Sequence, residues 1–134
     1  MQESIIIDVN IWISYFIKSK TTEIFDLIID NDLVVYSNKN LRNELIEVIH
    51  RKKFTKYLTT ESISNNILIF DELTTNFNTK KQFTGSPDSK DDYLYDLAIQ
   101  SNSKILVTGD KKLIEFKITN LDVISLLEFK NILK

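Results

Sequence analysis

The chain has 134 residues, of which 43% are hydrophobic and 27% charged, the ordinary balance of a globular protein. This length predicts a single domain over residues 1–134, long enough to bury a sizeable core. With two glycines and one proline, the composition excludes a low-complexity chain and argues against an all-β sandwich, which needs many turns. The absence of cysteine excludes disulfides and thiolate metal sites, and the single histidine excludes a multi-histidine zinc site.

Charge and hydropathy exclude further classes of protein. Seventeen basic and nineteen acidic residues leave a net charge of −2, which excludes a protein that grips duplex DNA by charge alone. No segment approaches the roughly 20 apolar residues of a membrane span, and the N-terminal MQESIIID lacks the basic region of a signal peptide. We therefore expect a soluble, cytoplasmic protein with no membrane partner.

Short apolar runs alternate with helical patterns along the chain. The runs at 5–7, 33–36, 105–107 and 123–124 predict buried strands. Apolar residues at helical spacing predict helices at 12–17, at 24–29 with Ile24, Phe25, Ile28 and Ile29 inward, at 41–49, near 61–73, at 89–102, and at the C-terminus up to Lys134. Gly85-Ser86-Pro87 is the strongest loop signal. This alternation predicts an α/β fold, a three-layer α/β/α sandwich with a mainly parallel central sheet.

Two of the predicted strands lead into acids. Asp8 ends the strand at 5–7, and Asp110 follows the strand at 105–107. Ligands bind outside the carboxyl ends of the strands in such a sheet. A solvated aspartate that closes a strand is the plain alternative for each residue, but two at one edge favour a functional site.

Helix geometry adds two candidates and sets two neighbouring acids aside. Asp91 shares a face with the apolar residues of the helix predicted at 89–102, where a carboxylate is costly unless something pairs with it. Asp92 and Asp96 are expected toward solvent, Asp92 in a capping box with Ser89 and Asp96 as a surface charge. Glu44, at the margin of the stripe in 41–49, is the weaker candidate, since most such glutamates are solvated or paired with lysine.

The four candidate acids are Asp8, Glu44, Asp91 and Asp110, and if their carboxylates converge they repel one another and need a counter-charge. The chain has only two arginines and one histidine, none next to these acids in the sequence, so the predicted neutraliser is Mg²⁺ or Mn²⁺. Carboxylates with such a cation most often serve phosphoryl chemistry.

The remaining basic and aromatic residues have plainer expectations. His50 is expected to end a helix, while the basic run 51–53 is either a solvated face or a guide for a phosphate backbone. We expect Trp12 and Phe16 in the core or an oligomer contact, and Tyr93 and Tyr95 are further aromatics to consider for base stacking.

The segments IIIDVNIWIS, SNKNLRNELIEVIHRKKF and SPDSKDDYLYDLAIQSNSKILVTGDKKLI resemble the conserved blocks of PIN-domain nucleases, especially the toxin components of prokaryotic type II toxin–antitoxin pairs. The resemblance implies an endoribonuclease that cleaves RNA phosphodiesters by metal-activated water, leaving a 5′-phosphate and a 3′-hydroxyl. It implies Asp8 and Asp110 as primary ligands of Mg²⁺ or Mn²⁺, completed by Glu44 and Asp91. It also implies an RNA substrate, an antitoxin protein as partner and a homodimer.

Further positions follow from the same resemblance. Asn10 matches a polar position near the site, and Thr108 matches a hydroxyl that supports an acid, although a β-branched residue is also ordinary at a strand end. Lys112 stands where many relatives carry another aspartate, which leaves open whether one or two metal ions bind and whether Lys112 meets a substrate phosphate. Arg51 and Lys52 are the other candidates for phosphate contact.

Three other readings stay open. A haloacid-dehalogenase-like phosphatase needs Asp-x-Asp, where this chain has Asp8 and Asn10. A receiver-like domain needs a phosphoacceptor aspartate after a middle strand, where Ser37 follows 33–36. A non-catalytic PIN-like module for RNA binding or assembly has no reason to keep four costly carboxylates.

Overall fold

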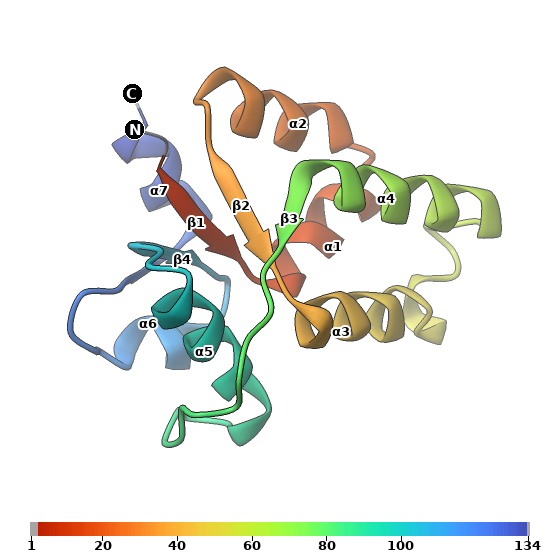
Figure 1. Ribbon diagram of the computed structural model, residues 1–134. Helices are drawn as coiled ribbons and strands as arrows, with labels where there is room; N and C mark the ends of the chain where they lie inside the picture. Colours follow the sequence, from red (N-terminus) through yellow and green to blue (C-terminus); the bar gives the residue numbers. More distant parts are fainter. Residues whose placement is uncertain (1–2, 134) are drawn as a thin grey trace.

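The computed structural model describes residues 3–133, and it confirms the predicted three-layer α/β/α architecture. Five parallel strands form one sheet in the order β3-β2-β1-β4-β5, and helices cover both of its faces (Figure 1). The strands are β1 (Ser4–Ile7), β2 (Val34–Ser37), β3 (Thr74–Asn76), β4 (Ile105–Val107) and β5 (Asp122–Ile124). The helices are α1 (Val9–Ile17), α2 (Thr21–Asp30), α3 (Lys39–Ile49), α4 (Thr60–Leu73), α5 (Asp92–Gln100), α6 (Lys111–Glu115) and α7 (Leu126–Ile132), with 3₁₀ turns η1 (Lys52–Phe54) and η2 (Ser89–Asp91).

The central strand β1 is enclosed on both faces, as its uninterrupted apolar run predicts. Ile5, Ile6 and Ile7 are all buried, and β1 pairs with β2 on one side and β4 on the other. Trp12 is fully buried, and its indole N–H donates to the carbonyl of Ile7 at 3.2 Å, which ties α1 to the end of β1. The Trp12 ring also packs edge-on against the Phe70 ring, with 4.9 Å between the ring centres. The prediction that Trp12 lies in the core is therefore confirmed.

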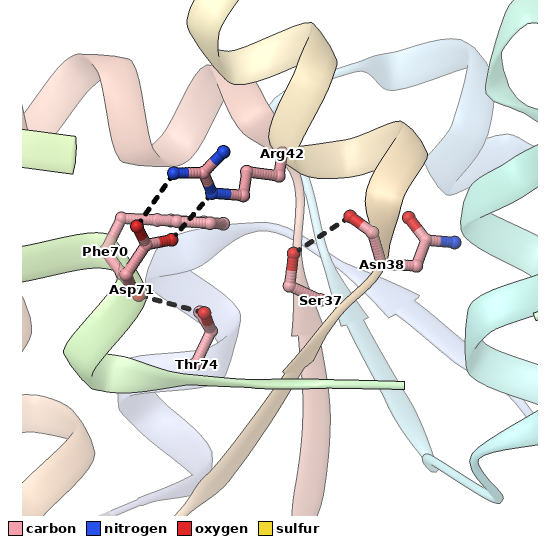
Figure 2. A network of polar contacts seen from close by, with 6 residues as sticks. All are labelled: Ser37, Asn38, Arg42, Phe70, Asp71 and Thr74. Atoms are coloured by element: carbon pink, nitrogen blue, oxygen red, sulfur yellow. Dashed lines mark hydrogen bonds and ion pairs between the residues drawn. The ribbon is translucent and has the colours of Figure 1, made fainter. Parts of the chain in front are cut away.

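Two elements had no signal in the sequence. The edge strand β3 follows α4 without a turn, and its residues Thr-Thr-Asn are mostly exposed, so no apolar run marks it. Its backbone is held by pairing with β2 instead. Near this junction the guanidinium of Arg42 on α3 contacts both carboxylate oxygens of Asp71 on α4 at 2.8 and 2.9 Å (Figure 2). The helix α6 spans five residues, too few to show a helical period.

Two helices differ from their predicted form at the surface. On α2, Ile24 and Ile28 are buried, but Phe25 and Ile29 are exposed, because two positions a turn apart are enough to reach the core. The C-terminal helix α7 ends at Ile132, and Lys134 lies outside the described residues. Within residues 3–133, no helix is long and apolar enough to cross a membrane.

The predicted start of the helix at 89–102 is wrong, and so is the placement of two of its acids. Residues 89–91 form η2, which Asp88 caps by accepting from the Lys90 amide, and α5 begins only at Asp92. Asp92 and Asp96 are buried rather than solvent-facing. The physical reason is that the segment 80–88 folds back over the face of α5 that the helical pattern assigns to water.

These two carboxylates hold that segment in place. Asp96 accepts backbone hydrogen bonds from Gln82 and Phe83, the latter at 2.8 Å. Asp92 accepts from the backbone N–H of Ser86 at 3.1 Å and from its hydroxyl. Because the segment leads directly into η2, the two buried acids also position the residue between them and the loop, Asp91.

We predict that Asp96→Ala lowers the free energy of unfolding by about 1–3 kcal/mol, since it leaves the part-buried backbone N–H groups of Gln82 and Phe83 without their acceptor. Urea denaturation measures this difference. Asp26→Ala, at an exposed position of α2, is the matched control and should change stability by less than about 0.5 kcal/mol. Equal effects of the two variants would contradict the role assigned to Asp96.

Candidate active site

Asp8 and Asp110 leave the sheet at the same edge because their strands are parallel neighbours in register. Ile7 pairs with Val107, and the backbone N–H of Asp8 donates to the carbonyl of Val107 at 2.9 Å. Each aspartate then caps the helix that follows. Asp8 accepts from the Val9 amide at 2.7 Å at the start of α1, and Asp110 accepts from the Lys112 amide at 2.9 Å at the start of α6.

The buried hydroxyl of Thr108 connects the two acids. It donates to Oδ2 of Asp8 at 2.7 Å and accepts from the backbone N–H of Asp110 at 3.1 Å. Asn10 adds a second link between the same turns, since its side-chain oxygen accepts from the Gly109 amide at 3.3 Å. Both carboxylate oxygens of Asp8 are therefore hydrogen-bonded, and the side chain is held in one orientation.

Glu44 and Asp91 reach the site from helices on either side. Glu44 lies on α3 and Asp91 at the junction of η2 and α5, and both side chains are half-buried. The Tyr93 hydroxyl donates to Oε2 of Glu44, which joins α5 to α3. Burial and the Glu44 carboxylate raise the pKa of Tyr93 above its ordinary range, so the hydroxyl keeps the proton that it donates.

A single pocket of about 500 Å³ brings the four predicted acids together. Its lining includes Asp8, Glu44, Asp91 and Asp110, together with Asn10 and Arg51. Thr108 lies behind the wall, where it contacts Asp8, and neither Lys52 nor Lys112 lines the pocket. Lys112 is exposed at the start of α6, two residues after Asp110.

Sequence reasoning missed the roles of two residues of this region, Tyr93 and Lys18. Tyr93 was considered only for base stacking, yet its hydroxyl bonds Glu44, while Tyr95 is buried and stacks on Phe83 at 4.8 Å. Lys18 also lines the pocket, and no motif distinguishes it from the other lysines of the chain, whereas Lys53, another lining residue, belongs to the basic run 51–53 that the sequence offered as a guide for phosphate. The position of Tyr93, two residues after Asp91 in the sequence, is the one signal that points toward the site.

The acids of the pocket affect one another's ionisation. Burial raises the pKa of Asp8 from 3.8 to about 6, with further increases from Glu44 and Asp110, while hydrogen bonds from Thr108 and Val9 oppose the rise. Burial also raises the pKa of Asp91 to about 7, followed by repulsion from Asp8 and Glu44. No lysine or arginine among residues 3–133 forms an ion pair with any of the four; Arg51 contacts Glu47 instead, at 3.6 Å. The site therefore carries negative charge without a cationic partner from the described residues.

The donor set suits a hard divalent cation, although the side chains do not converge on one point. Across the described part of the chain, no group of three or more histidine, cysteine, aspartate or glutamate side chains lies close enough to form a ready-made metal shell. Mg²⁺ does not require one, because it usually keeps several waters and is bound through one or two carboxylates. The oxygen donors and uncompensated charge of the pocket fit such an ion.

The raised pKa values predict how stability depends on pH. An acid whose pKa is higher in the folded state than in the unfolded state destabilises the fold as pH rises, here between about 4 and 7. In EDTA, Asp8→Asn should therefore stabilise the protein at pH 7.5 by up to about 3 kcal/mol and have little effect at pH 4. Thermal unfolding at the two pH values measures this. Asp122→Asn, at an exposed position of β5, should show no such pH dependence.

Comparison with known proteins agrees with this arrangement. The family model described as PIN domain matches residues 4–112, most of the chain and all four acids of the pocket. No curated protein matches the chain. PIN domains are generally nucleases and typically use divalent metals. Because the match runs from the first strand past the last of these acids, the chain belongs to the PIN-domain family.

Proposed function

We propose that this protein is an Mg²⁺- or Mn²⁺-dependent endoribonuclease that hydrolyses RNA phosphodiesters in the acid-lined pocket. The observation that carries the proposal is the meeting of Asp8, Glu44, Asp91 and Asp110 in one pocket, where none of them forms an ion pair with a lysine or arginine of residues 3–133. Family membership supports the nuclease class. The RNA substrate and the cation are inferred from the resemblance and from the donor chemistry.

In this mechanism the residues of the chain supply positioning and charge. Asp8 and Asp110 would hold the cation at the sheet edge, with Thr108 fixing the orientation of Asp8. Glu44 and Asp91 would complete the set of oxygen donors or orient a water, with Tyr93 holding Glu44. When bound, the cation supplies compensating charge, a lowered pKa for water and stabilisation of the phosphate in the transition state.

A divalent cation held by these acids would lower their pKa values. Asp8 and Asp91, with pKa values of about 6 and 7 in the absence of metal, become fully ionised when a divalent charge lies beside them. Cation binding is therefore expected to release protons near pH 6 and to weaken as the pH falls.

The proposal includes the biological role that the resemblance implies. We infer a toxin of a type II toxin–antitoxin pair, acting in the cytoplasm, with a small antitoxin protein as partner and a homodimer as the assembled form. A gene for a small DNA-binding protein directly beside this one would support the toxin role.

Cleavage of RNA tests the activity. The purified protein should cleave structured RNA with Mn²⁺ and not with EDTA, and Asp8→Asn or Asp110→Asn should reduce the rate at least about a hundredfold, since each removes charge that holds the cation. The matched control, Asp122→Asn, changes an exposed acid of β5 and should cleave at the parent rate. Parent-rate cleavage by Asp8→Asn would contradict the assignment of the site.

Thermal unfolding tests cation binding separately from cleavage. Mn²⁺ should raise the midpoint of the parent protein, because a cation that binds only the folded state stabilises it by mass action. This Mn²⁺-induced rise in the midpoint should be much smaller in Asp8→Asn and as large as that of the parent in Asp122→Asn. If the parent shows no rise, or Asp8→Asn shows the same rise, a non-catalytic RNA-binding or assembly module becomes the better reading.

A further inference from the structure

The acid-lined pocket continues as a groove between α1 and α3, two helices that pack against each other. On α1 its lining recurs at helical spacing, through Asn10, Ile13, Ser14, Ile17 and Lys18. On α3 it passes from Glu44 to Val48, one turn further along, and beyond the end of this helix it reaches Arg51. These positions form one face of each helix. The groove therefore runs from the acids at the sheet edge toward the far ends of both helices.

The two ends of this groove differ in charge. The acids stand at the sheet edge, and the exposed cations Lys18, Arg51 and Lys53 stand where α1 and α3 end. Ten residues separate Asp8 from Lys18, which corresponds to about 15 Å along the helix axis. An anion bound by the cations is thus distant from one bound at the acids, and a single phosphate does not reach both ends.

The middle of the groove is apolar. Its wall consists of Ile13, Ile17 and Val48 from the two helices and Phe54 from η1, and the last three are only partly buried. Lys53 lies over the Phe54 ring, with its Nζ 5.0 Å from the ring centre. A cation and an aromatic surface therefore stand together where the apolar wall meets the cationic end of the groove. Such a wall offers contact area to a flat, weakly polar group.

The cations at the far end are available to a ligand. Arg51 has only the exposed contact with Glu47 at 3.6 Å, and such surface pairs contribute little. The other arginine of the chain, Arg42, is held by both oxygens of Asp71 and does not line the groove. Arg51, Lys18 and Lys53 therefore provide the positive charge of this region.

We propose that the middle of the groove is a nucleobase subsite, in which one unstacked base of a single-stranded RNA lies against Phe54, Ile17 and Val48. The phosphate on one side of this nucleotide lies at the acids, and a phosphate further along lies at Arg51 and Lys53. Paired bases are stacked inside a duplex and cannot enter such a groove, whereas unstacked bases commonly pack on aromatic side chains. This inference rests on the proposed nuclease function and names the residues of this chain that would hold one base of the RNA.

Binding without cleavage tests the subsite. Fluorescence anisotropy would compare a labelled oligouridine octamer with a fully abasic ribose–phosphate octamer, using Asp8→Asn protein in EDTA and low salt. We expect the abasic strand to bind about five- to a hundredfold more weakly, the range observed for loss of a base–aromatic contact. A duplex of the same length should also bind more weakly than the octamer. Equal affinity for the oligouridine and abasic strands, or no binding of oligouridine, overturns the proposal.

Variants in the same background assign the subsite to its residues. Phe54→Ala should weaken oligouridine binding and leave abasic binding nearly unchanged, a difference that a general loss of structure would not produce. Phe54→Leu, which keeps apolar packing, serves as the second variant if the alanine protein does not fold. Tyr57→Ala changes an exposed aromatic residue outside the groove and is the control. Equal losses for Phe54→Ala and Tyr57→Ala overturn the assignment.

Salt dependence tests the cationic end. Arg51→Gln should lower the slope of log affinity against log salt by about 0.7, the value for one contact with a single strand. Lys104→Gln, at the opposite edge of the sheet before β4, should leave the slope unchanged. Because these measurements need no catalysis, a protein that binds as expected but does not cleave would refute the nuclease and keep the subsite. A protein that cleaves but binds the abasic strand equally well would do the reverse.

Discussion

The central constraint on this structure is that it holds carboxylates of like charge close together at one edge of the sheet. Asp8 is buried beside Glu44 and Asp110, and its pKa rises to about 6 because water is excluded and these neighbours repel it. Hydrogen bonds from Thr108 and the Val9 amide oppose that rise and hold the carboxylate in place. The fold thus accepts a local loss of stability, a pattern expected where charge is kept for binding or catalysis rather than for stability.

The acids of this region have different roles although they look alike in the sequence. Asp92 and Asp96 are buried and accept backbone hydrogen bonds, which fix the segment 80–88 across α5. The Asp91 side chain, beside them, makes no capping hydrogen bond to the backbone of α5 and lines the pocket with Asp8 and Glu44. The structural pair therefore holds the functional candidate in position, and substitutions at the three sites should be separable by stability and activity.

The groove extends the same logic away from the sheet. Acids repel a phosphate unless a cation stands between them, whereas Lys18, Arg51 and Lys53 attract one about 15 Å further along. The apolar wall between the two ends has no charge of its own. A polynucleotide, which alternates phosphates with flat bases, matches this sequence of surfaces better than a small anion does.

The amino-acid sequence by itself determined the layered α/β architecture and the sheet edge at which Asp8 and Asp110 stand. The apolar runs at 5–7 and 105–107 must be buried, and parallel strands place whatever follows them, Asp8 and Asp110, at one edge. The helical period predicted Asp91 on the inner face of a helix, and the structure places it half-buried in η2, just before α5, where it lines the pocket. These inferences succeed because they depend on local periodicity and on the chemistry of a single strand or helix.

Only the tertiary structure decided which polar groups meet. The burial of Asp92 and Asp96 depends on the return of segment 80–88, and β3 exists because β2 offers an edge to a polar segment. The bond from Tyr93 to Glu44 and the gathering of Lys18 and Lys53 at the pocket join residues far apart in the chain. Helical and strand periods describe which face of an element is apolar, but not which distant backbone or side chain will cover the other face.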